Sequence, residues 1–81
     1  MKTYIALLRG INVGGHKKVS MAHLRDVLTK SGLENVKTYI QSGNVIFQSL
    51  KENKGELEVL IHNAIMAHFG FDVPILVRSK N

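Results

Sequence analysis

The order of strand-type and helix-type patterns limits the folds open to this chain more than any other feature. Short segments rich in β-branched and aromatic residues, bounded by Gly, Pro or Asn, indicate strands at residues 3–9, 35–40, 45–47 and 73–78. Two amphipathic patterns indicate helices that begin after Ser20 and Asn53 and end at Gly32 and Gly70. The resulting order, β-α-β-β-α-β, predicts a ferredoxin-like two-layer sandwich. This is an α+β fold with both helices on one face of an antiparallel sheet.

The length of the chain, 81 residues, gives room for one small α+β domain spanning 1–81. Pro74 has no N–H to donate to a sheet, so the last strand is expected at a sheet edge. Cysteine is absent, which excludes disulfides and thiolate metal sites. The first apolar run, Tyr4 to Leu8, is too short for a membrane span or a signal-peptide core. We therefore expect a cytoplasmic protein with no membrane partner.

Apolar residues occupy both faces of the predicted strands. In the first strand Tyr4, Ala6 and Leu8 alternate with two further apolar residues, Ile5 and Leu7, and the predicted strands at 45–47 and 73–78 show the same pattern. In a free-standing sheet of this kind, the face away from the helices should be polar. We expect a cover on that face, either a dimer mate or a second α+β half of the same polypeptide. The alternative is that scattered apolar residues are simply left exposed.

The predicted topology brings the long loop at 10–19, the hairpin turn at 41–44 and the end of the second helix to one end of the sheet. Ten residues exceed the usual length of a strand-to-helix loop. Glycines let backbone N–H groups approach an anion, and a helix N-terminus follows. The candidate ligand-binding residues at this end are Arg9, Asn12, Gly14, Gly15, Lys17, Lys18, Gln41, Ser42 and Asn44.

The chain carries a net charge of +5, which favours acidic partners such as a phosphate-bearing small molecule or nucleic acid, although solubility explains it equally well. The spacing of Gly10 and Gly15 is that of a phosphate loop. His16 and Lys17 follow where that motif needs Lys and Ser or Thr, so we reject a nucleotide-triphosphatase loop. The first hypothesis is an anion- or nucleotide-binding module that uses the loop at 9–18 and the hairpin at 41–44.

Two alternatives to that module stay open. One is a structural half-domain that packs on a second half and has no ligand of its own. The other is a degenerate RNA-recognition-like module, which would need Tyr4 and Phe47 on the open face of the sheet, although these positions are more typical of a core. The histidines show no metal-binding spacing, and Asp72 is assigned to the turn after the second helix. We expect no cofactor and see no catalytic set, so an enzyme is not indicated for this stretch by itself. An enzyme whose catalytic groups come mainly from a second half of the polypeptide stays open as a further alternative.

Three strings of the chain closely resemble a bacterial family of unknown function, domain family 1697. They are YIALLRGINVGG at 4–15, TYIQSGNV at 38–45 and FGFDVP at 69–74. The resemblance implies a chain about twice this long, built of two similar α+β halves, with this sequence as the N-terminal half. It implies no activity, substrate or catalytic residue.

Overall fold

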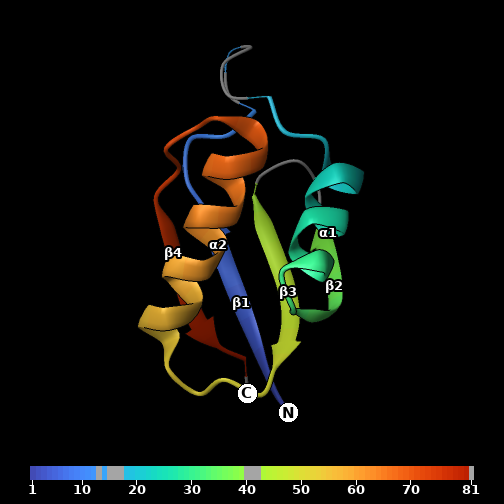
Figure 1. The fold of residues 1–81 in the computed structure, drawn as a ribbon, viewed down its shortest axis with the longest axis vertical. Helices are drawn as coiled ribbons and strands as arrows, with labels where there is room; N and C mark the ends of the chain where they lie inside the picture. The colour runs from blue at the N-terminus through green and yellow to red at the C-terminus, as the bar shows by residue number, and fades with distance from the viewer. Residues whose placement is uncertain (13, 15–17, 40–42, 81) are drawn as a thin grey trace.

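The computed structural model describes residues 1–12, 14, 18–39 and 43–80, which form six elements in the predicted order. These are β1 (Lys2–Leu8), α1 (Met21–Lys30), β2 (Glu34–Tyr39), β3 (Asn44–Ser49), α2 (Lys54–Phe69) and β4 (Ile75–Ser79). The strands form one antiparallel sheet in the order β2-β3-β1-β4, and both helices lie on the same face of it (Figure 1). The ferredoxin-like prediction is confirmed.

Both helices begin at the predicted caps. The Ser20 side chain accepts a hydrogen bond from the backbone N–H of His23, and the Asn53 side chain accepts one from that of Glu56 at 3.0 Å. Helix α2 ends at Gly70, whose φ of 74° is left-handed and therefore suits glycine. Helix α1 ends two residues before the predicted Gly32. Neither helix, within the residues described, is long and apolar enough to cross a membrane.

Strand β4 lies at the sheet edge, as Pro74 predicted, but it begins only at Ile75, after the proline. The N–H of Val77 donates to the Glu58 carboxylate of α2 at 2.9 Å, so a side chain satisfies a donor that no neighbouring strand can reach. At the opposite edge, β2 is irregular between Glu34 and Lys37. Irregular pairing and a carboxylate cap both discourage edge-to-edge association.

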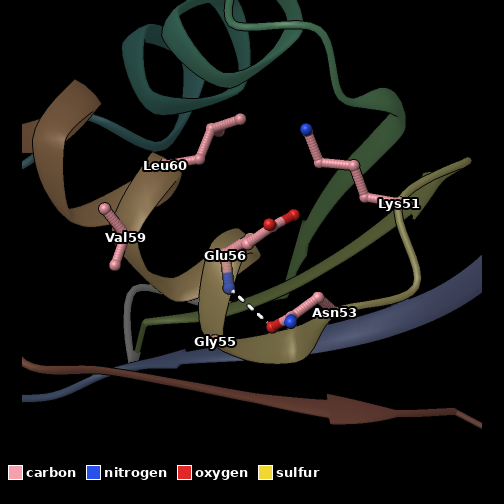
Figure 2. Close-up of a pocket in the computed structure, with 6 residues that line it drawn as sticks. All are labelled: Lys51, Asn53, Gly55, Glu56, Val59 and Leu60. Atoms are coloured by element: carbon pink, nitrogen blue, oxygen red, sulfur yellow. Dashed lines mark hydrogen bonds between the residues drawn. The ribbon is translucent and has the colours of Figure 1, made fainter.

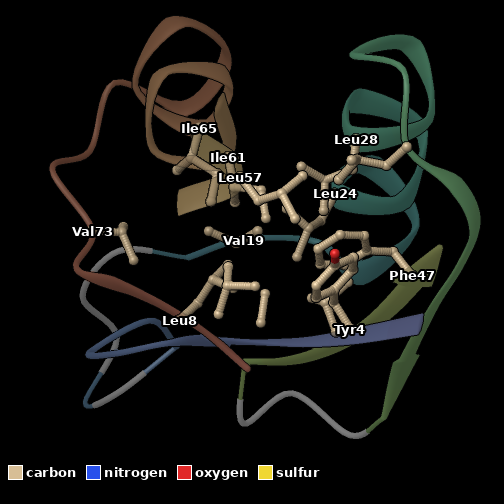
Figure 3. Close-up of a cluster of buried hydrophobic side chains, with 14 of the residues drawn as sticks. Tyr4, Leu8, Val19, Leu24, Leu28, Phe47, Leu57, Ile61, Ile65 and Val73 are labelled. Atoms are coloured by element: carbon tan, nitrogen blue, oxygen red, sulfur yellow. The ribbon is translucent and has the colours of Figure 1, made fainter. Parts of the chain in front are cut away.

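The core lies between the sheet and the helices (Figure 3). Tyr4 and Phe47 are fully buried there, with their ring centroids 5.6 Å apart, and the Tyr4 hydroxyl donates to the backbone C=O of Lys51 at 2.7 Å. Neither ring reaches the open face, so neither can stack on a base. The RNA-recognition-like alternative therefore loses the two aromatics on which it depended.

Candidate functional site

The end of β1, the hairpin at Gly43 and the segment that leads from α2 into β4 meet at one end of the sheet, as the topology predicted (Figure 1). The N–H of Leu8 donates to the C=O of Gly43 at 2.9 Å, and the N–H of Arg9 donates to the C=O of Pro74 at 3.1 Å. Gly43 approaches so closely that a Cβ built on it would lie 2.3 Å from the Leu8 carbonyl oxygen. The first loop therefore starts between the hairpin and the segment that leads into β4. We call this region the loop end.

Asn12 joins the two ends of the long loop. Its Nδ2 donates to the C=O of Val19 at 3.1 Å, and its Oδ1 accepts from the N–H of Val19 at 2.8 Å. Ile11 and Val19 are both buried in the core, so the loop is anchored at both sides of this pair. Asn12 has a φ of 56°, a left-handed conformation that Asn tolerates better than most residues. The amide that the sequence suggested for a ligand thus closes the loop in this structure.

The other predicted ligand-binding residues differ in their surroundings. Arg9, Gly14 and Lys18 are exposed at the loop end. Asn44 is half-buried and belongs to β3, not to the turn, because it pairs with Leu7 and with Tyr39. The remaining four predicted residues lie outside the described part of the chain: Gly15, Lys17, Gln41 and Ser42.

The carboxylate of Asp72, near the loop end, binds His62 of α2, with Nε2 and Oδ1 2.7 Å apart. This hydrogen bond, with a smaller contribution from Asn63, raises the pKa of His62 above its ordinary value. Sequence analysis missed the pair because the two residues are ten positions apart with no repeating spacing. They meet because the left-handed Gly70 turns the chain back along α2.

The open face of the sheet, opposite the helices, has an apolar centre. The register places Lys37, Ile46, Ile5 and Arg78 in one row across β2, β3, β1 and β4. The two isoleucines are half-buried, and the two basic residues at the edges are exposed. Because directly paired residues point to the same side of a sheet, all four side chains lie on this face.

The rows on either side extend this pattern in opposite ways. Toward the loop end, Leu7 pairs with Leu76, and both are half-buried, so the apolar centre continues there. Toward the other end the row is polar, because Gln48 donates to the Thr3 hydroxyl at 3.3 Å and accepts a hydrogen bond from Asn35. A shallow hollow of about 280 Å³ lies over this polar row.

A wider hollow of about 550 Å³ opens at the N-terminus of α2 (Figure 2). The start of α2 lies at the opposite end of the molecule from the loop end (Figure 1). Its lining residues are Lys51, Asn53, Gly55, Glu56, Val59 and Leu60. The position of Lys51 is well held, because its C=O accepts from buried Tyr4 and its N–H donates to the Ser49 hydroxyl at 3.1 Å. Sequence analysis treated this stretch only as a polar surface loop. The local sequence of this loop does not indicate that Leu60 of the following helix lines a hollow together with it.

No cluster of three His, Asp or Glu residues suited to a metal ion occurs within the residues described. What these observations define is a ferredoxin-like α+β unit with one face covered by helices, an open face with an apolar centre, and a basic loop at one end.

The chain belongs to the family described as protein of unknown function (DUF1697), whose model matches residues 1–81. It is also similar to a solved structure, that of the conserved bacterial protein SP0830 from Streptococcus pneumoniae. The two share 42% sequence identity with a TM-score of 0.84, and the match covers 96% of this chain but 43% of the pneumococcal one. The chain thus spans less than half the length of that relative. No curated protein matches it.

Proposed function

We propose that this chain is a docking unit that packs its open sheet face against a further part of a longer polypeptide. The observation that carries the proposal is the half-buried apolar centre formed by Ile5, Leu7, Ile46 and Leu76. A lone two-layer sandwich should present polar residues at these positions. The length of the pneumococcal relative supports the proposal, since more than half of that chain lies outside the match.

The size of the apolar centre favours a covalently connected cover over a separate partner. Burying the remaining exposed parts of these four side chains would contribute about 0.5 kcal/mol each, or about 2 kcal/mol together. Association of two separate molecules costs at least about 4 kcal/mol in lost translational and rotational freedom. A segment of the same polypeptide avoids most of that cost because its effective concentration is high.

A hydrophobic dye tests the docking face directly. We expect the 81-residue chain to bind the dye, and the substitutions Ile46→Thr and Leu76→Thr to reduce the fluorescence while the far-UV circular dichroism stays unchanged. Met66→Thr is the matched control, because Met66 is 39% exposed but lies on α2, away from the open face and from the hollow at the start of that helix. Absence of dye binding, or an equal reduction by the control, would contradict the proposal.

A second candidate function is anion binding at the loop end, for a phosphate-bearing small molecule or nucleic acid. The Asn12–Val19 pair holds the loop closed, Arg9 and Lys18 are exposed, and the first turn of α1 contains no acidic residue. The Asp72 carboxylate near this end is paired with a histidine and competes less for an anion.

NMR titration with inorganic phosphate, a nucleoside triphosphate and a short RNA tests this second function. We expect shifts at Arg9, Gly14 and Lys18, and weaker binding after Lys18→Glu. Lys51→Glu is the control, because it makes the same charge change at the opposite end of the molecule. Unperturbed loop-end signals at millimolar ligand, or equal effects of the two substitutions, would contradict the assignment.

A further inference from the structure

The open face carries positive charge at both edges of its apolar centre. Lys37 on β2 and Arg78 on β4 end the row that runs through Ile46 and Ile5, and both are exposed. Three strand spacings separate the two backbone positions, a distance of about 14 Å. The chain's six carboxylate residues are Asp26, Glu34, Glu52, Glu56, Glu58 and Asp72.

None of these carboxylates lies in the row between the two cations. Glu34 lies in the irregular part of β2, where it pairs with Gln48 and lines a hollow together with Leu60 of α2. The others belong to the helices or to the loops that flank α2, and of these Glu58 reaches the β4 edge from the helix side, where it accepts from the N–H of Val77, next to Arg78. The electrostatic character of the central face is therefore set by Lys37 and Arg78.

This charge pattern opposes self-association through the open face. Two copies stacked face to face are related by a two-fold axis that lies between the sheets. If the axis runs along the strands, β2 of one copy lies over β4 of the other, and Lys37 faces Arg78. If the axis runs across the strands, each strand lies over its own copy, and Lys37 faces Lys37. Both arrangements place like charges together at the two edges of the apolar centre, which is unfavourable.

We infer that the occupant of the open face is not a second copy of this chain but a segment of a longer polypeptide with the complementary pattern. That segment has an apolar centre and carboxylates on both sides, spaced to meet Lys37 and Arg78. The inference rests on the proposed docking function and adds the identity of the partner surface. Charge complementarity sets register and rejects wrong partners, here the second copy.

Reversing one edge charge tests the inference. With Arg78→Glu, a two-fold stack along the strands places Lys37 of each copy against the new carboxylate of the other, so the face becomes self-complementary. At millimolar protein concentration in sedimentation equilibrium, we expect this variant to self-associate more than the neutral control Arg78→Ala, with a dissociation constant about 30-fold lower. High salt should weaken the variant dimer, because the edge charges are exposed and screened.

Adding Lys37→Glu to Arg78→Glu restores like charges, and we expect this double variant and the wild-type chain both to be monomeric. A wild-type dimer that Ile46→Thr abolishes would overturn the inference, because a second copy would then fit the face. An Arg78→Glu variant no more associated than Arg78→Ala would also overturn it, because the edge charges would not select the partner. Neither result touches the docking function itself, which the dye experiment tests on the apolar centre alone.

Discussion

Substitution of Asn12 by alanine should destabilise the fold through the loop that this residue closes. The side chain makes two hydrogen bonds to the backbone of Val19, at 2.8 and 3.1 Å, in a partly buried setting. Losing both costs about 2 kcal/mol, at about 1 kcal/mol for each bond. The φ of 56° adds about 1 kcal/mol, because alanine tolerates the left-handed region poorly. The expected total is about 3 kcal/mol.

Urea unfolding followed by circular dichroism measures this loss. For a domain of this size, about 3 kcal/mol corresponds to a fall of about 15 °C in Tm. Asn12→Gly is the matched control, because it removes the same hydrogen bonds without the left-handed strain. We expect it to be about 1 kcal/mol more stable than Asn12→Ala. An alanine variant that unfolds at the wild-type urea midpoint would refute the reasoning, since the pair with Val19 would then contribute nothing.

Two further predictions concern close contacts around the loop end. Gly43→Ala should lower the free energy of unfolding by at least about 3 kcal/mol, because the new Cβ would lie 2.3 Å from the Leu8 carbonyl oxygen. Gly10→Ala is the control for urea or thermal unfolding: Gly10 has a similar φ but no atom within 4 Å of the new Cβ, so the loss should be about 1 kcal/mol. Equal losses in the two variants would contradict the contact. Asp72→Asn should lower the pKa of His62 in an NMR titration. Because folding raises the pKa of His62 above the ordinary 6.5, the stability that the pair contributes is fully present below pH 6.5 and is lost as the pH rises through the raised pKa. Asp72→Asn should therefore weaken the dependence of the free energy of unfolding on pH in this range. The same pH dependence in the variant and the wild type would refute the prediction.

Local signals in the sequence were enough to predict the order of the elements and the places where the helices begin. Ser20 and Asn53 cap helices because a side-chain oxygen binds an N–H only three residues on, which depends on neighbours in the chain alone. The edge position of β4 followed from the missing N–H of Pro74. The presence of apolar residues on both faces of the strands could also be predicted, because side chains in a strand alternate between the two faces.

The roles of individual polar residues depended on contacts between distant parts of the chain. The sequence places Asn12 among glycines and suggested it as a ligand-binding residue. Only the folded structure brings the backbone of Val19 to its side-chain amide. The pairing of His62 with Asp72 likewise follows from the left-handed turn at Gly70, and no repeating spacing in the sequence indicates this pair. Predictions on Gly15, Lys17, Gln41 and Ser42 fall outside the described residues and stay predictions.

The sequence by itself determined the fold class and the presence of apolar residues on both faces, since both depend on short-range periodicity. Only the tertiary structure decided which apolar residues form the core and which remain on the open face. Tyr4 and Phe47 went to the helix side, and Ile5 and Ile46 stayed on the other. The register between strands then aligned Lys37 with Arg78 across the face. The register between strands pairs residues that are far apart in the chain, so the pattern within a single strand does not determine it.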